Sequence, residues 1–221
     1  MTPDTWTAVD QYITDRLLAP DAALDGAVQA STDAGLPAIA VSAAQGKFLH
    51  LLAKIIHPRR ILEIGTLGGY STIWLARALS PGGRLITLEF DPKHATVARA
   101  NLANAGLSGV VDVRVGRAID ALPTLAGGEP FDLIFIDADK ASTPDYFEWA
   151  ITLSHPGSVI VVDNVVRAGR LIDEKGDEDI QGMRRFMDGL AADPRVNATA
   201  LQTVGVKGYD GFAIAVVEGG R

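Results

Sequence analysis

The amino-acid sequence predicts an α/β fold built on a doubly wound, Rossmann-like and mostly parallel sheet. Five short apolar runs between residues 60 and 163 each end in a polar or glycine-containing turn, which is typical of strands buried on both faces of a parallel sheet. Stretches with helical spacing of apolar residues separate these runs. The chain has 221 residues, 48% of them apolar, so we expect residues 1–221 to form a single domain around one core.

Three helices are expected before the first strand, over residues 3–18, 21–34 and 42–56, so residues 1–57 form a helical segment ahead of the α/β core at 58–221. The strand runs are RILEIG, RLITLE, VVDVRV, FDLIFID and SVIVVD, with helices near residues 69–79, 92–105, 118–125 and 143–153. A polar loop at 165–179 precedes a helix at 180–192. The last two runs, 198–204 and 211–217, flank the turn-like GVKGYDG and predict a C-terminal antiparallel hairpin on the sheet edge.

Composition and charge restrict the classes of molecule that the chain is expected to bind. The formal net charge is −7 and the chain has no dense basic run, which argues against nucleic acid as a ligand. No apolar run approaches the roughly 20 residues that span a bilayer, and the N-terminus is acidic where a signal peptide is basic. The chain has no cysteine. We therefore expect a cytoplasmic protein that acts on a small molecule, with no membrane partner.

A glycine turn follows the first strand run in residues 63–71, EIGTLGGYS. Open α/β sheets bind ligands at this end of their strands, although NAD enzymes share the feature and tight packing alone also explains it. Glu63 precedes the glycines, where it would repel a pyrophosphate and favour a cationic ligand. Glu89 ends the second strand, where an acidic side chain accepts hydrogen bonds from a ribose, unless it is a solvated strand end. S-adenosylmethionine has a ribose, an ammonium group and no phosphate.

The motif EIGTLGGYS followed by TLEFD resembles the cofactor motifs of class I methyltransferases, and specifically the caffeoyl-CoA and catechol O-methyltransferase family. The resemblance runs from about residue 40 to the C-terminus and implies S-adenosylmethionine as methyl donor. The resemblance implies that Gly65, Thr66 and Ser71 hold the methionine end, Glu89 the ribose, that Ala118 lies beside the adenine, and that Val41 closes over the cofactor. Further expected cofactor-binding residues are Glu63, Gly69 and Asp137. For Val41, a buried helix residue is nearly as good an interpretation.

The fourth and fifth strand runs end in FIDADK and VVDN. If these strands are neighbours, about 4.8 Å apart, Asp137 and the pair Asp163-Asn164 emerge side by side. Two carboxylates that close require a proton or a cation between them. Their oxygens and the amide oxygen fit a divalent cation, most simply Mg²⁺, that keeps open positions for substrate. The alternative is that Asp163-Asn164 caps the following turn.

Lys140 follows Asp137 by three positions, and this Asp-x-x-Lys pattern resembles the catalytic lysine of the same family. The resemblance implies that metal coordination favours the phenolate of the substrate while Lys140 accepts its proton. The chain departs from the family after this motif: plant members have a tyrosine soon after DADK, whereas Tyr146 is at best a later match. Asp139 has no assigned role, and the substrate, its methylated hydroxyl and the preferred metal stay open.

The sequence thus predicts methyl transfer from S-adenosylmethionine to a hydroxyl of a catechol-like or hydroxycinnamoyl molecule. Two alternatives are an NAD-dependent oxidoreductase and a catalytically silent, methyltransferase-like binding module. A homodimer is also expected, because the N-terminal helix carries more apolar residues than a lone appendage should expose, unless they pack on the chain's own core. These residues are Trp6, Val9, Ile13, Leu17 and Leu18.

Overall fold

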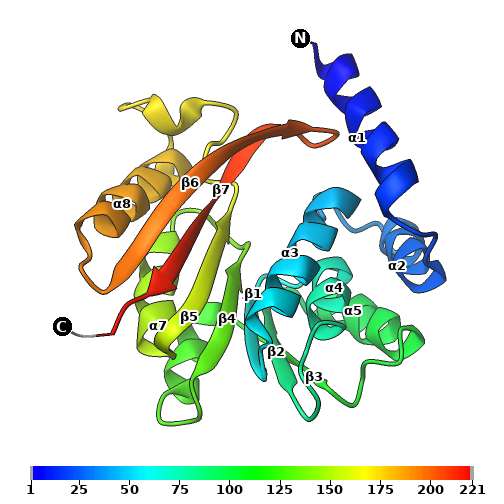
Figure 1. Ribbon diagram of the computed structural model, residues 1–221, viewed down its shortest axis with the longest axis horizontal. Coiled ribbons are helices and arrows are strands. Elements are labelled where there is room, and N and C mark those ends of the chain that lie inside the picture. The colour runs from blue at the N-terminus through cyan, green and yellow to red at the C-terminus, as the bar shows by residue number, and fades with distance from the viewer. Residues whose placement is uncertain (1, 220–221) are drawn as a thin grey trace.

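The sheet of the computed structural model, which describes residues 2–219, confirms the predicted fold class (Figure 1). Within these residues the strands form one seven-stranded sheet in the order β3-β2-β1-β4-β5-β7-β6. The strands are β1 (Arg60–Ile64), β2 (Arg84–Glu89), β3 (Val111–Val115), β4 (Phe131–Ile136), β5 (Ser154–Asp163), β6 (Val196–Gly205) and β7 (Gly208–Val217). Strands β1 to β5 pair in parallel, whereas β7 runs antiparallel to both β5 and β6. The predicted edge hairpin is therefore confirmed.

Helices cover both faces of the sheet (Figure 1). The helices are α1 (Pro3–Leu17), α2 (Ala22–Asp33), α3 (Ala43–Ile56), α4 (Tyr70–Ala76), α5 (Pro92–Asn104), α6 (Ala118–Ala121), α7 (Thr143–Thr152) and α8 (Glu178–Ala192). Side chains of α3 and α4 pack on one face of the strands, and those of α7 and α8 pack on the other. Helix α2 lies outside, against α4 and α5. Within residues 2–219, no helix combines the length and apolar character needed to cross a membrane.

Side-chain caps define where several helices begin. Asp21 accepts hydrogen bonds from two backbone N–H groups of α2, and Ser42 accepts one from Gln45 at the start of α3. Asp91 and Asp177 do the same for α5 and α8. Each cap satisfies an N–H group that the first helical turn leaves without a partner. The helix starts thus follow from polar residues visible in the sequence.

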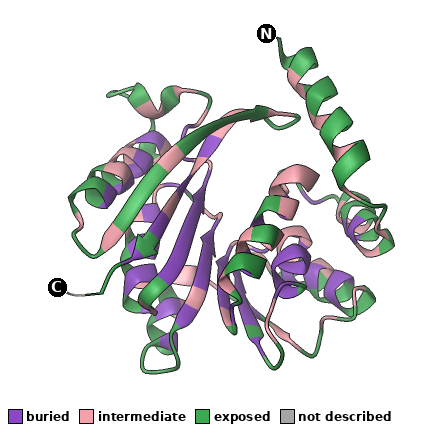
Figure 2. Cartoon of the chain, viewed as in Figure 1, coloured by how far each residue is buried: buried purple, intermediate pink, exposed green. Residues whose placement is uncertain are grey.

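The central strands are buried on both faces (Figure 2). In β4, Ile134 and Ile136 face the α7 and α8 side, while Leu133 and Phe135 face α3 and α4. A strand buried on both faces excludes charge from its middle, because an unpaired charge there is costly. Charged side chains of these strands are consequently found mainly at the strand ends, and Glu63 in β1 is the exception.

The structure differs from the predicted elements in three places. The expected helix at 118–125 is one α-helical turn, α6, followed by a 3₁₀ turn at Leu122–Leu125, because Pro123 lacks the N–H that would continue an α-helix. Strand β5 starts at Ser154, ahead of the run beginning at residue 158. The loop after β5 contains a short 3₁₀ turn at Arg170–Ile172.

Candidate active site

A cavity of about 1030 Å³ opens at the carboxyl ends of the parallel strands. Small-molecule pockets commonly measure about 300–1000 Å³, so this one has room for a cofactor and a second ligand. Register places the strand ends in a row, because Ile64 pairs with Ile136, and Ile136 with Val162. The predicted site residues that line the cavity are Val41, Gly65, Thr66, Ser71, Glu89, Ala118, Asp137, Lys140, Asp163 and Asn164.

The two glycines predicted to contact the cofactor have different surroundings. Gly65 lies in the cavity wall with φ of 97°, and a side chain there would collide with the backbone oxygen of Asp137. Gly69 does not line the cavity; it has φ of 82°, begins α4 and faces Ala98 of α5. The left-handed conformation is the reason for glycine at both positions. Gly69 therefore serves the turn that begins α4 and its packing against α5.

Glu63 lies behind the cavity wall instead of facing a ligand. Its side chain is fully buried and accepts hydrogen bonds from the hydroxyls of Ser71 at 2.7 Å, Thr72 at 2.5 Å and Thr87 at 2.7 Å. Burial raises the pKa of Glu63 to about 7, although these three hydrogen bonds oppose the rise. Of these residues only Ser71 lines the cavity. Glu63 thus reaches the cavity indirectly, by orienting Ser71.

Glu89 lines the cavity and also holds the glycine turn. One carboxylate oxygen accepts the backbone N–H groups of Thr66 at 3.1 Å and Leu67 at 2.7 Å, and the other accepts that of Asp91 at 2.9 Å. His94 of α5 approaches the same carboxylate at 3.4 Å. The side chain is mostly buried, so the alternative of a solvated strand end is wrong.

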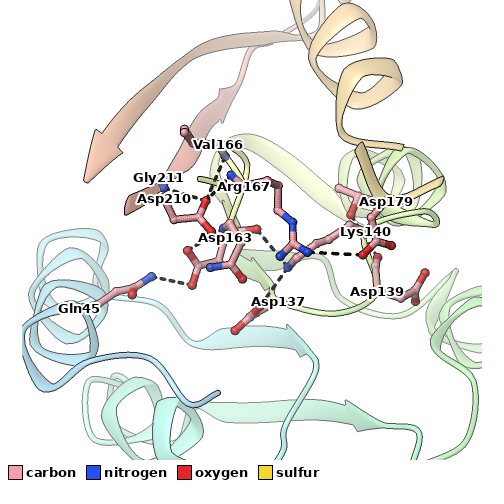
Figure 3. Close-up of polar contacts among 12 residues, drawn as sticks. Gln45, Asp137, Asp139, Lys140, Asp163, Val166, Arg167, Asp179, Asp210 and Gly211 are labelled. Carbon is pink, nitrogen blue, oxygen red and sulfur yellow. Dashed lines mark hydrogen bonds and ion pairs between the residues drawn. The ribbon is translucent and has the colours of Figure 1, made fainter. Parts of the chain in front are cut away.

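The ends of β4 and β5 bring two carboxylates and one lysine together (Figure 3). Lys140 Nζ donates to a carboxylate oxygen of Asp137 at 3.1 Å and to the backbone oxygen of Asp163 at 3.2 Å. The Asp163 carboxylate accepts the side-chain amide of Gln45 at 2.6 Å and the backbone N–H of Asn164 at 2.8 Å. Burial, together with the nearby negative charge of Asp137, raises the pKa of Asp163 to about 7.

The donor set at these strand ends fits a hard divalent cation. Asp137, Asp163 and Asn164 all line the cavity and can offer side-chain oxygen ligands, while the ammonium of Lys140 is paired with Asp137 and bonded to the backbone oxygen of Asp163. Within residues 2–219 no group of three His, Cys, Asp or Glu side chains could hold a metal ion, so a cation at these strand ends would need ligands beyond the two carboxylates, such as the amide oxygen of Asn164. The backbone N–H of Asn164 donates to the Asp163 carboxylate, so this carboxylate also caps the turn that follows β5, as the alternative interpretation expected.

Asp139, for which the sequence indicated no role, fixes the loop that carries Asp137 and Lys140. Its carboxylate accepts the Tyr146 hydroxyl at 2.6 Å and the backbone N–H of Ser142 at 3.0 Å. Burial acts to raise the pKa of Asp139, but these hydrogen bonds outweigh it and hold the pKa below its usual value. Burial and the Asp139 carboxylate in turn raise the pKa of Tyr146. The loop is therefore braced by an ionised aspartate and a neutral tyrosine.

Sequence reasoning missed several polar residues of the cavity. They are Gln45, His94, Arg117, Arg167, Asp179 and Lys207. Gln45 lies three positions after the capping residue Ser42, and His94 lies three positions after the capping residue Asp91, so the first turns of α3 and α5 offered a signal for both. Arg167 lies in the loop after β5 and Asp179 in the first turn of α8, and only the folded chain brings them together.

Comparisons with known proteins agree with this geometry. A family model described as O-methyltransferase matches residues 20–214. A catechol O-methyltransferase of Niastella koreensis is 54% identical over 221 residues, or 99% of this chain and 100% of the relative. The solved O-methyltransferase from Bacillus cereus in complex with SAH is 58% identical and has a TM-score of 0.97, over 98% of this chain and 100% of that chain. TomG of Streptomyces achromogenes, an O-methyltransferase solved with SAM, is 53% identical and has a TM-score of 0.96, over 99% and 100% of the two chains.

These matches decide between the two enzyme classes that a glycine turn after the first strand allows. An NAD-dependent oxidoreductase would share the doubly wound sheet, but the matched family model describes methyl transfer to oxygen. The likeness extends over nearly the whole length of the solved relatives. The chain belongs to the O-methyltransferase family.

Proposed function

We propose that the protein transfers the methyl group of S-adenosylmethionine to a hydroxyl of a catechol-like small molecule, with the help of a divalent cation. The observation that carries this proposal is Lys140, held 3.1 Å from Asp137 and beside the buried Asp163 in the same cavity as Glu89 and the glycine turn. Relatives described as bound to SAM or SAH support the donor, and the relative named catechol O-methyltransferase supports the acceptor class.

The cofactor half of the cavity offers a neutral wall and one acidic acceptor. Gly65, Thr66 and Ser71 supply backbone and hydroxyl groups, and Glu89 supplies carboxylate oxygens for a ribose. Ala118 and Val41 give apolar surface for an adenine and for closure over the cofactor. The fixed negative charge of Asp137, at the end of the next strand, suits a sulfonium cofactor electrostatically.

Asp137, Asp163 and Asn164 would hold the divalent cation, for which we propose Mg²⁺ on the strength of the oxygen-only donor set. A bound dication supplies positive charge that favours the ionised form of a phenol, whose pKa is otherwise about 10. Gln45 contributes indirectly, because its amide orients the Asp163 carboxylate.

The chain's own chemistry is proton transfer and alignment. Lys140, in its neutral form, accepts the hydroxyl proton at Nζ while Asp137 orients its side chain. The acceptor oxygen then attacks the methyl carbon, the carbon–sulfur bond breaks, and the sulfonium becomes a neutral thioether. Because anion and sulfonium neutralise one another, catalysis depends mainly on alignment and on exclusion of water.

The test is an assay of catechols and hydroxycinnamoyl esters with labelled S-adenosylmethionine, with and without EDTA. We expect methylated catechol in the presence of magnesium and no turnover after chelation. Full activity in EDTA, with no metal left on the protein, would overturn the cation and leave methyl transfer standing. Tight binding of adenosylhomocysteine without turnover of any acceptor would instead support the catalytically silent module.

We also propose a homodimer that uses α1. In this helix no residue is buried, and Val9, Tyr12 and Leu17 are each at least half exposed. Figure 1 shows α1 standing away from the sheet, near the tip of the β6–β7 hairpin. Such apolar exposure on one helix favours a protein partner. Light scattering at micromolar concentration tests this, and a monomer there would contradict it.

A further inference from the structure

Arg167, one of the two arginines that line the cavity within residues 2–219, lies in a backbone segment that hydrogen bonds to β7 hold in place. Just after β5, the Asp210 carboxylate of β7 accepts the backbone N–H groups of Val166 at 3.1 Å and Arg167 at 2.9 Å (Figure 3). The next N–H, of Ala168, bonds to the backbone oxygen of Tyr209 at 3.1 Å. Arg167 and Ala168 both have left-handed φ, 55° and 56°, which residues with side chains adopt only when their surroundings enforce it. The fold therefore holds the backbone of Arg167 and sets the direction in which its Cα–Cβ bond leaves the chain.

The guanidinium of Arg167 has a weak partner. It lies 3.5 Å from the carboxylate of Asp179, which is 47% exposed at the start of α8. Figure 3 shows the two side chains meeting next to Lys140. Arg170, three residues on, instead forms a 2.8 Å hydrogen bond with Asp177 and does not line the cavity. A guanidinium carries five N–H donors, so Arg167 keeps donors for a further anion.

The other positive charges of the cavity are engaged or lie elsewhere. Lys140 is bound to Asp137, and Lys207 donates to the backbone oxygen of Ala38 at 3.1 Å. Arg117 adjoins Ala118, the residue assigned to the adenine. Arg167 is the cation at the end of β5, above the group that would take the acceptor's proton. Arg167 and Lys140 both line the cavity, so a ligand near Lys140 has Arg167 within the same cavity wall (Figure 3).

We propose that Arg167 recognises a carboxylate on the acceptor, so that the preferred substrate is a catechol carboxylate, and that Asp179 competes for the same guanidinium. The inference rests on the proposed function and names its substrate class. The planar fork of arginine matches a carboxylate in two parallel hydrogen bonds, which a neutral substituent does not provide. The choice of substrate then depends on the charge of the substituent that faces Arg167, which is separate from the catalytic groups.

The test compares protocatechuate with its neutral amide, protocatechuamide, as acceptors. Arg167→Met keeps the apolar stem and removes the charge, so the KM for protocatechuate should rise by about tenfold or more, as for a lost charge-assisted hydrogen bond. The KM for the amide should change by less than about twofold, and kcat should change little for both. Arg167→Lys should restore part of the protocatechuate affinity. The matched control Arg170→Met should leave both acceptors unaffected.

Asp179→Asn distinguishes recognition of the acceptor carboxylate by Arg167 from a purely structural ion pair between Arg167 and Asp179. If Asp179 competes for Arg167, this variant should lower the KM and the calorimetric Kd for protocatechuate, measured with adenosylhomocysteine bound, and so act opposite to Arg167→Met. If the ion pair is purely structural, Arg167→Met and Asp179→Asn should change the KM in the same direction for both acceptors. That result would overturn the inference. Equal KM values of wild-type enzyme and Arg167→Met for protocatechuate would also overturn it, with methyl transfer intact. If the wild-type enzyme methylates neither acceptor, the proposed function itself fails, and the inference fails with it.

Discussion

The two halves of the cavity treat their carboxylates differently. On β1 and β2, Glu63 accepts three hydroxyls and Glu89 accepts three backbone N–H groups. On β4 and β5, Asp137 and Asp163 face each other with one lysine to compensate them. The chain therefore satisfies its acidic groups in the cofactor half and leaves net negative charge in the acceptor half. The carboxylates of the first half are hydrogen-bonded within the chain, while those of the second half carry more negative charge than Lys140 offsets, which supports the proposed cation.

This contrast divides the expected effects of mutation. A carboxylate satisfied by the chain's own donors holds the fold or the glycine turn, so its loss should change stability or cofactor affinity. A carboxylate left uncompensated costs stability on its own, and its value appears when a cation or a reacting group is present. Changes in the β4–β5 half should therefore act on the rate and on the response to ions.

The largest effect is expected at Lys140. Lys140→Ala should lower kcat by roughly 10²–10⁴-fold, the usual contribution of a positioned base, while the Kd of adenosylhomocysteine stays the same. The loss should shrink at higher pH and with more acidic catechols, because solvent then supplies more phenolate. Lys207→Ala is the matched control, since that lysine lines the cavity but donates to a backbone oxygen. A rate loss that is constant across pH would assign Lys140 to substrate positioning instead of proton transfer.

The buried Glu63 should make the free energy of unfolding depend on pH. Its pKa in the folded protein, about 7, lies above the ordinary value of 4.5, so the stability linked to its protonated form is complete below pH 4.5 and is lost as pH rises through 7. Glu63→Gln cannot ionise. Relative to this variant, the wild type should lose on the order of 3 kcal/mol over that range, measured by urea unfolding. The exposed Glu129→Gln should show no such trend, and a flat difference for Glu63→Gln would disprove the buried-charge explanation.

Glu89 should affect cofactor affinity more than stability. Glu89→Ala removes the acceptor for a ribose and releases the N–H groups of Thr66 and Leu67, so the Kd of adenosylhomocysteine should rise tenfold or more, about 1.4 kcal/mol. Glu89→Gln keeps the shape of the side chain, so its Kd should lie between those of the wild type and Glu89→Ala. The change should be the same with and without magnesium, because this half is satisfied without ions. An unchanged Kd in a folded variant would exclude Glu89 from the cofactor site.

Sequence analysis predicted correctly the features that follow from strand order and from the carboxyl ends of parallel strands lying at one edge of the sheet. The alternation of strands and helices is a local pattern, and in a doubly wound fold the residues that follow each parallel strand share an edge. The shared position of Glu89, Asp137 and Asp163 in the cavity wall was predicted in this way. The short form of the 118–125 helix was also visible in principle, because Pro123 lies within it.

What the sequence could not supply depends on contacts between distant segments. Gln45 meets Asp163 across 118 positions, and no local pattern encodes that pair. Glu63 was expected to face a ligand, since a strand buried on both faces does not reveal which way each side chain points. The hydroxyls of Thr72 and Thr87 that satisfy it come from a helix and a neighbouring strand.

The effect of Asp163 on stability should change sign when magnesium is added. Above pH 7 and without magnesium, its buried carboxylate is ionised near Asp137, so Asp163→Asn should stabilise the protein, by on the order of 1 kcal/mol. Excess magnesium should raise the Tm of the wild type, since a ligand bound only by the folded state adds stability with the logarithm of its concentration. The variant lacks one carboxylate ligand and should gain less, so the order of the two Tm values should invert. Asp145→Asn, which changes another aspartate of the cavity, should respond to magnesium as the wild type does. If Asp163→Asn is destabilised without magnesium and equally stabilised by it, the carboxylate serves only to cap its turn.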